Sequence, residues 1–104
     1  TVCGDGGLGQ YLADFTTAVK YGLDLTVVVL NNGRLGKIAK EQRAGEYAVW
    51  QTDLVNPSFA AYAELCGAHG VRVETRDGLR DALDAAIAHP GTALVEVMQD
   101  AQLI

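Results

Sequence analysis

The spacing of apolar residues changes along the chain in a way that predicts alternating helices and strands. Between residues 10 and 21, apolar side chains recur at helical spacing, and Gly22 is well placed to end that helix. The run Leu-Thr-Val-Val-Val-Leu at residues 25–30 hardly alternates, which is typical of a parallel strand that helices cover on both faces. Residues 1–3 look like the last part of another strand, so we expect a domain truncated at its N-terminus.

The second half of the chain continues this alternation. A short helix is expected over residues 35–43, followed by an irregular stretch that could be a mobile cover over an active site. Asn56 is expected to cap the next helix, with Pro57 in its first turn. The remaining expected elements are a strand at residues 71–73, a helix that buries Leu79, Leu83, Ala86 and Ile87, and a strand over residues 92–98. The pattern predicts one α/β domain over residues 1–104, with a doubly wound, mostly parallel sheet.

Composition and charge exclude several functional classes. With 104 residues, 49% of them hydrophobic and 20% charged, the chain fits one compact soluble domain. No apolar run reaches the roughly 20 residues that cross a bilayer, so we expect a cytoplasmic protein, with peripheral membrane association of a larger parent left open. The net charge of −5 argues against nucleic-acid binding. Cys3 and Cys66 lie far apart without a metal-binding pattern, and we interpret both as reduced core residues.

Two polar turns follow two of the expected strands, at the place where open α/β sheets bind ligands. One is Gly4-Asp5-Gly6-Gly7, and the other is Asn31-Asn32-Gly33-Arg34. Glycines let backbone N–H groups approach an anion closely, and a helix N-terminus adds positive potential. Asp5 would repel a bare phosphate unless a hard cation such as Mg²⁺ stood between them, and Asn32 could give that ion an amide oxygen.

Each turn alone is a weak signal, because Gly-Asp-Gly and Asn-Asn-Gly also form ordinary turns. Their combination is more specific, since 24 residues that hold an expected helix and an apolar strand separate Gly-Asp-Gly from Asn-Asn. The non-enzymatic alternative is a regulatory module that binds a phosphate or nucleotide through its backbone and needs no metal.

The paired turns resemble the thiamine diphosphate motif, and the resemblance extends over essentially all 104 residues. The segments VVVLNNGRLG, AGEY and NPSFAAYAELCGAHGVRVE look like the C-terminal domain of the family of pyruvate oxidase, quinone-dependent pyruvate dehydrogenase and acetolactate synthase. The resemblance implies that Mg²⁺ is bound by Asp5, the Asn32 side chain and the backbone carbonyl of Arg34. It implies that thiamine diphosphate is bound by Gly4, Asp5, Gly6, Gly7, Asn32, Arg34, Leu35 and Gly36.

The resemblance further implies an enzyme that decarboxylates a 2-oxo acid, most simply pyruvate. Glu41 stands where the pyruvate-oxidising members carry a glutamate near the substrate, so we interpret it as a candidate catalytic residue of a flavoprotein oxidoreductase, with FAD bound outside this chain. The plain alternative is a solvated Glu41 paired with Lys37 or Lys40. Lys37 departs from the family, because pyruvate oxidases usually carry an aromatic residue there. An acetolactate synthase-like carboligase or a simple 2-oxo-acid decarboxylase is the runner-up.

The resemblance also implies a homodimer or homotetramer, because the family's cofactor lies between this domain and a domain of another subunit. The family's activating glutamate belongs to that other domain, so the segment by itself is expected to be inactive. Trp50, in the irregular stretch, is a candidate for contact with a partner subunit or for closing the site, against a plain packing role.

Overall fold

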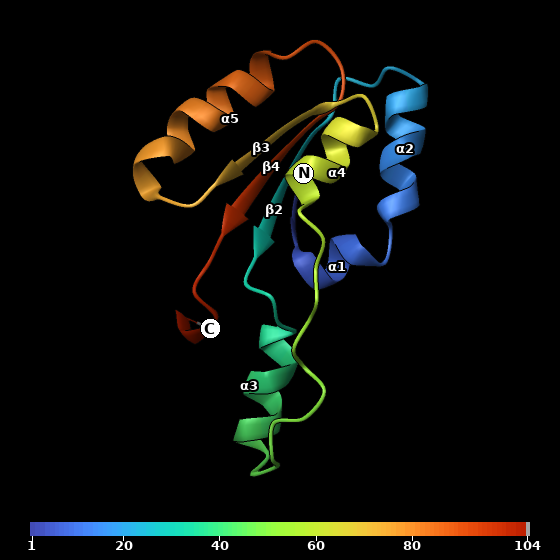
Figure 1. Ribbon diagram of the computed structural model, residues 1–104. Helices are drawn as coiled ribbons and strands as arrows, with labels where there is room; N and C mark the ends of the chain where they lie inside the picture. Colours follow the sequence, from blue (N-terminus) through green and yellow to red (C-terminus); the bar gives the residue numbers. More distant parts are fainter. Residues whose placement is uncertain (104) are drawn as a thin grey trace.

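A computed structural model describes residues 1–103 of the chain, and its centre is a parallel sheet of four strands (Figure 1). The strands lie in the order β1-β2-β4-β3, and all neighbouring pairs are parallel. Their bounds are Val2–Gly4 for β1, Thr26–Asn31 for β2, His69–Val73 for β3 and Ala93–Met98 for β4. The two long strands, β2 and β4, are paired in the middle of the sheet.

Helices cover both faces of this sheet. They are α1 (Asp5–Gly9), α2 (Leu12–Lys20), α3 (Gly36–Ala44), α4 (Phe59–Leu65) and α5 (Leu79–Ala88), with short 3₁₀ turns at Arg76–Gly78 and Ala101–Leu103. α2 and α4 lie on one face, and α5 lies on the other (Figure 1). The expected fold class, an α/β domain with a parallel sheet, is therefore confirmed.

Side chains that alternate along the strands build two apolar layers. On one face, Val29 and Leu94 pack with Phe59 of α4, which is fully buried. On the other face, Val95 packs with Ala86 of α5. Burial of this kind stabilises the fold by about 25 cal/mol per Å² of apolar surface removed from water.

The helix expected over residues 10–21 is confirmed as α2, and the glycine-rich segment before it forms an additional short helix, α1. Two local expectations are wrong. Asn56 does not cap α4; the cap is Ser58, whose hydroxyl accepts a hydrogen bond from the Ala61 N–H, while the Asn56 side chain turns toward the sheet. Ile87 is 70% exposed, since it lies about 100° around α5 from the buried Ala86.

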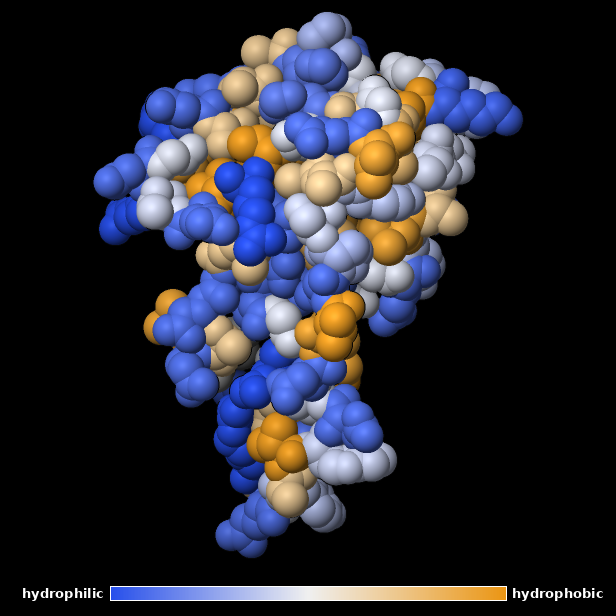
Figure 2. All heavy atoms as spheres, viewed as in Figure 1, coloured by the Kyte–Doolittle hydropathy of each residue, from blue (hydrophilic) through white to orange (hydrophobic). Residues whose placement is uncertain are grey.

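Residues 35–54 form an arm that projects beyond the sheet, with α3 running outward and an irregular segment returning (Figure 1). Its base is closed by two backbone hydrogen bonds, Leu35 N–H to the Thr52 carbonyl at 2.7 Å and Leu54 N–H to the Gly33 carbonyl at 2.8 Å. In the space-filling view, apolar residues lie at the surface of the arm between hydrophilic ones (Figure 2). The expected short helix and irregular stretch are confirmed.

Within residues 1–103, no helix combines the length and the apolar character that spanning a membrane requires.

Gly70 provides a test of how α4 packs on the sheet. A Cβ atom at this position would collide with the backbone carbonyl of Ala60 in α4, and a backbone carbonyl cannot move aside as a flexible side chain can. We expect Gly70→Ala to destabilise this region by about 1–3 kcal/mol, measured by amide hydrogen exchange in β3 and α4. Gly78→Ala is the matched control, because a Cβ there meets no atom within 4 Å. Equal exchange in both variants would contradict the described packing.

Candidate functional site

A pocket of about 410 Å³ lies where β1 and β2 end at the same edge of the sheet. Every residue predicted to bind the cofactor lines it: Gly4, Asp5, Gly6, Gly7, Asn32, Arg34, Leu35 and Gly36. Leu30, Lys37, Ile38 and Gln99 complete the lining. The structure therefore brings the two predicted turns together around one cavity.

The glycine-rich segment forms the side of the pocket that suits an anion. β1 ends at Gly4 and α1 begins at Asp5, so the first N–H groups of α1 have no acceptor within the helix. A Cβ atom on Gly4 or Gly7 would meet no atom within 4 Å, which means that the space beside this backbone is open to a ligand. Gly6 differs, because a Cβ there would lie 2.5 Å from Cδ2 of Leu35. The Leu35 side chain thus packs directly on the glycine backbone.

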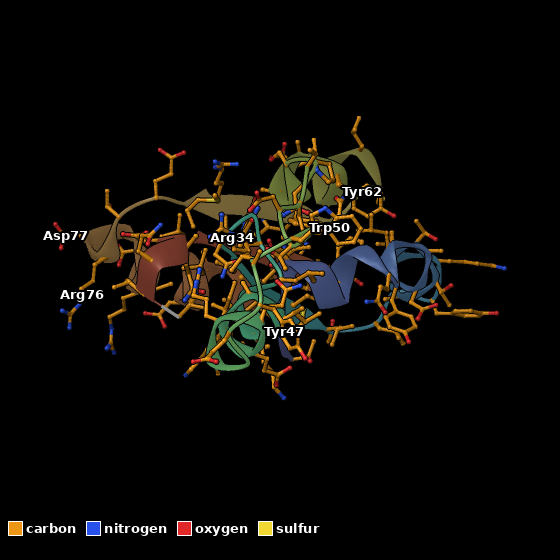
Figure 3. All side chains as sticks on the ribbon, turned by 90° about the horizontal axis from the view of Figure 1, so that it is seen from below. Arg34, Tyr47, Trp50, Tyr62, Arg76 and Asp77 are labelled. Atoms are coloured by element: carbon orange, nitrogen blue, oxygen red, sulfur yellow. The ribbon has the colours of Figure 1, made fainter. Side chains whose placement is uncertain are left out.

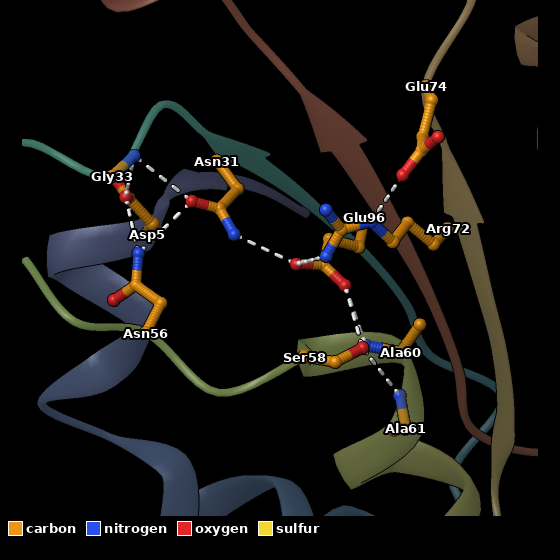
Figure 4. Close-up of polar contacts among 10 residues, drawn as sticks. All are labelled: Asp5, Asn31, Gly33, Asn56, Ser58, Ala60, Ala61, Arg72, Glu74 and Glu96. Atoms are coloured by element: carbon orange, nitrogen blue, oxygen red, sulfur yellow. Dashed lines mark hydrogen bonds and ion pairs between the residues drawn. The ribbon is translucent and has the colours of Figure 1, made fainter.

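Asp5 is the charged group of the pocket, and only 3% of its surface is exposed. Its Oδ2 accepts hydrogen bonds from the Gly33 N–H at 2.9 Å and from Nδ2 of Asn56 at 2.7 Å (Figure 4). Among residues 1–103, no donor is bonded to Oδ1. A buried carboxylate with one oxygen left over has capacity for a cation.

The second turn places two asparagines differently. Oδ1 of Asn31 accepts the Gly33 N–H at 3.1 Å, and Oδ1 of Asn32 accepts the Arg34 N–H at 2.9 Å. The left-handed φ of +67° at Gly33 lets the chain turn sharply between them. Asn31 is buried beneath the turn, whereas Asn32 lines the pocket.

The side chain and carbonyl of Arg34 have separate roles. Its guanidinium forms an ion pair with Asp53 at the base of the arm, at 2.7 Å. Its backbone carbonyl accepts the Gly36 N–H at 2.9 Å and retains a second lone pair. The contribution of this carbonyl oxygen to a metal site stays a prediction.

The residues present fit Mg²⁺ with a bound diphosphate. A carboxylate, an amide oxygen and a carbonyl oxygen are the ligands that a hard divalent cation prefers, and they surround one pocket with free N–H groups beside it. Within the described residues 1–103, no three His, Cys, Asp or Glu side chains gather to hold a metal ion. A cation here would therefore depend on oxygens of the ligand as well as on Asp5.

Glu41, the predicted catalytic residue, lies on α3 and is not part of the pocket lining. Its carboxylate is 3.9 Å from Nζ of Lys37, one helical turn away, and both side chains are exposed. Lys37 does line the pocket. The plain interpretation of an ion pair on α3 agrees with this geometry, while a catalytic role for Glu41 stays a prediction.

Sequence reasoning missed a buried carboxylate next to the site. Glu96 lies in β4 with 0% exposure, and its Oε1 accepts a hydrogen bond from Nδ2 of Asn31 at 2.8 Å (Figure 4). Its Oε2 accepts from the Ala60 N–H at 3.1 Å and the Ser58 hydroxyl at 3.3 Å. Arg72 lies 3.6 Å from Oε1. The sequence does indicate this buried carboxylate, because Glu96 is the only charged residue in the apolar run 92–98.

The two cysteines carry no sign of site chemistry. Both are free and half-buried. Burial raises the pKa of the Cys3 thiol, which keeps it protonated and weakly nucleophilic at neutral pH. The expectation of reduced, unreactive cysteines agrees with this environment.

Comparison with known proteins places the chain in a family. The family model described as "Thiamine pyrophosphate enzyme, C-terminal TPP binding domain" matches residues 1–97, thiamine pyrophosphate being another name for thiamine diphosphate. YdaP of Bacillus subtilis (strain 168), whose name describes it as thiamine pyrophosphate-containing, is 43% identical over 97 residues, or 93% of this chain and 17% of that protein.

Two acetolactate synthases show a similar but weaker likeness. The enzyme of Bacillus subtilis (strain 168) is 30% identical over 96% of this chain and 18% of its own length. The mitochondrial catalytic subunit of Saccharomyces cerevisiae (strain ATCC 204508 / S288c) is 30% identical over 93% of this chain and 14% of its own length. The chain thus spans less than a fifth of each of these relatives. With its parallel sheet, its paired polar turns and its match over residues 1–97, the chain belongs to the family of C-terminal thiamine pyrophosphate-binding domains of thiamine pyrophosphate enzymes.

Proposed function

We propose that this domain anchors the diphosphate of thiamine diphosphate through Mg²⁺. The observation that carries the proposal is the pocket at the ends of β1 and β2, which gathers the predicted residues around the buried Asp5. Asp5, the Asn32 side chain and the Arg34 carbonyl would hold the cation, and the N–H groups of residues 4–7 would hold phosphate oxygens.

In this proposal, the residues that line the pocket bind and orient the cofactor. Thiamine diphosphate, when bound, supplies the electron sink that decarboxylation of a 2-oxo acid requires. Leu35, packed on Gly6, and Ile38 contribute apolar surface to the pocket lining. Beside apolar surface of this kind, hydrogen bonds and ion contacts to the diphosphate would be stronger than in bulk water.

Asp5 is the residue that tests the metal-bridged site. We expect Asp5→Ala, made in the full-length protein, to weaken thiamine diphosphate binding at fixed Mg²⁺ by about tenfold or more, a loss of at least about 1.4 kcal/mol. The reason is that the cation loses its only carboxylate ligand from this chain. Isothermal titration calorimetry measures the affinity, and Asp14→Ala on the exposed side of α2 is the matched control.

Unchanged or tighter binding in Asp5→Ala would reject the metal bridge. It would favour the alternative of a regulatory module that binds phosphate through its backbone, because removing a carboxylate relieves repulsion when no cation is present.

For the whole enzyme, we propose decarboxylation of a 2-oxo acid, with pyruvate as substrate and FAD, bound outside this chain, as electron acceptor. Support comes from the AGEY and NPSFAAYAELCGAHGVRVE segments, which resemble the pyruvate-oxidising members of the family, and from Glu41, which stands where those members carry a glutamate near the substrate. A carboligase that joins the decarboxylated unit to a second 2-oxo acid is equally well supported, because several relatives are named acetolactate synthases.

Anaerobic addition of pyruvate to the full-length protein, loaded with Mg²⁺ and thiamine diphosphate, separates the two reactions. If pyruvate is oxidised, we expect the flavin absorbance to bleach, because the flavin accepts two electrons and no oxygen is present to reoxidise it. Acetolactate in the product, with the flavin absent or still oxidised, would identify the carboligase and reject the oxidase.

We also propose that the whole protein is a homodimer or homotetramer in which the arm contacts a partner subunit. Tyr47 and Trp50 are 74% and 72% exposed, which is unusual for two large aromatic side chains on one short segment. Both residues belong to the irregular segment that follows α3, and the Trp50 backbone exchanges hydrogen bonds with the Gln42 side chain of α3 at 3.1 and 3.2 Å (Figure 3). The arm thus exposes two aromatic side chains.

Trp50→Asp tests the role of the arm in assembly. A charge placed in an apolar contact must lose its hydration, so we expect a larger share of monomer in sedimentation velocity runs at low micromolar concentration. Tyr21→Asp at the end of α2 is the matched control, since Tyr21 is also an exposed aromatic residue, at 67%. The same distribution of species in both variants would exclude the arm from the interface.

A further inference from the structure

A continuous line of hydrogen bonds joins Asp5 in the pocket to Glu96 in the middle of the sheet. Asn56 Nδ2 donates to Asp5 Oδ2 at 2.7 Å and to Asn31 Oδ1 at 3.0 Å, and Asn31 Nδ2 donates to Glu96 Oε1 at 2.8 Å (Figure 4). These four residues come from α1, β2, the segment before α4, and β4. They are far apart in sequence and meet only in the folded domain.

The donors and acceptors of this line can be arranged in only one direction. The Gly33 N–H can only donate and it meets Oδ1 of Asn31, so the amide group of Asn31 turns its NH₂ toward the Glu96 carboxylate. Its oxygen then faces the Gly33 N–H and the Asn56 NH₂, both of which are donors. Asn56 is thereby fixed with its NH₂ between Asn31 and Asp5. Glu96, the Gly33 N–H and the Asp5 carboxylate thus all require the same orientation of the two amides, and Glu96 holds the far end of the line.

The second oxygen of Glu96 holds the carboxylate in place. It accepts from the Ala60 N–H and the Ser58 hydroxyl at the start of α4. The carboxylate therefore cannot rotate away from Asn31 without leaving buried donors unsatisfied, which costs roughly 1–3 kcal/mol for each group. Glu96 is fixed from both sides.

We propose that Glu96 is a positioning residue for the Mg²⁺ site, acting through Asn31 and Asn56 on the carboxylate of Asp5. The proposal rests on the proposed function of the pocket. With Oδ2 held by two fixed donors, Oδ1 of Asp5 is the oxygen kept for the cation. Groups that orient a metal ligand in this way commonly change metal affinity by about 10- to 100-fold when they are replaced.

A purely structural role for Glu96 makes a different prediction. If the carboxylate only anchored the start of α4, its replacement would lower the melting temperature but leave the response to Mg²⁺ unchanged. The Mg²⁺ concentration that half-saturates thiamine diphosphate binding is therefore the informative measurement, with the melting temperature of the cofactor-free protein beside it.

The experiment begins with Glu96→Gln in the full-length protein. The new amide places an NH₂ against either Asn31 or the start of α4, where donors already point, so the line of hydrogen bonds must break or reverse. We expect the half-saturating Mg²⁺ concentration to rise by about tenfold or more. Glu64→Gln on the exposed side of α4 is the matched control, and we expect no change in that variant.

A second substitution tests the direction of the hydrogen bonds. Asn31→Asp alone places a second carboxylate against Glu96 and should also raise the half-saturating Mg²⁺ concentration. Combined with Glu96→Gln, it restores a full set of partners, because the new amide donates to the new carboxylate at position 31 while its oxygen accepts from the start of α4. The double variant has the same net charge as the original protein. We expect its Mg²⁺ requirement to return to within about threefold of the original value.

Three outcomes overturn the proposal: an unchanged Mg²⁺ requirement in Glu96→Gln, an unchanged requirement in Asn56→Ala, or no recovery in the double variant. Asn56→Ala removes a half-buried side chain outside the apolar layers, so it remains informative if Glu96→Gln does not fold. Asp5→Ala, measured in the same way, separates a failure of the proposed function from a failure of the positioning role of Glu96. If Asp5→Ala has no effect, the proposed function fails; if only Asp5→Ala has an effect, the positioning role alone fails.

Discussion

Two carboxylates, those of Asp5 and Glu96, are buried at the edge of an apolar layer, and the local structure keeps them hydrogen-bonded. A buried charge without partners costs several kcal/mol, more than most single packing contacts contribute. Satisfying both groups requires the ends of β1 and β2, the middle of β4 and the start of α4 to lie at fixed positions. The constraint that stabilises this corner of the fold therefore also gives the pocket its shape.

The fold could be predicted because its determinants are local. A parallel strand covered on both faces appears as an apolar run, as in residues 26–31, and amphipathic spacing marks α2 and α5. α1 could not be predicted, since three of its five residues are glycines with low helix propensity. Its helical turn is imposed by the path from β1 to α2. The cap of α4 could not be predicted, because the Asn56 side chain is bonded to Asp5 and Asn31 and Ser58 takes the capping position.

The candidate site also combines short local motifs, which the sequence reveals, with contacts between residues far apart in sequence, which it does not. The glycine-rich turn and Asn32 are recognisable because each is a short motif at the end of a strand, and together they identify the pocket. The site contacts of Glu96 and Asn56 could not be predicted, because their partners Asn31 and Asp5 lie 65 and 51 residues away. A lone glutamate in a buried strand indicates that a partner exists, but no spacing rule identifies it. The supporting residues of a site are therefore harder to read from sequence than the ligands themselves.

The arm and the pocket share the residues at their junction. Gly33 and Leu35 form the backbone hydrogen bonds that close the arm, and Arg34 between them joins Asp53 by its side chain while it also lines the pocket. A displacement of the arm therefore moves the Arg34 carbonyl, and a ligand that fixes this carbonyl restrains the arm. Free-energy coupling between two sites is reciprocal. A partner that binds the tip of the arm would therefore raise the affinity for the cofactor by the same factor by which the cofactor raises the affinity for that partner.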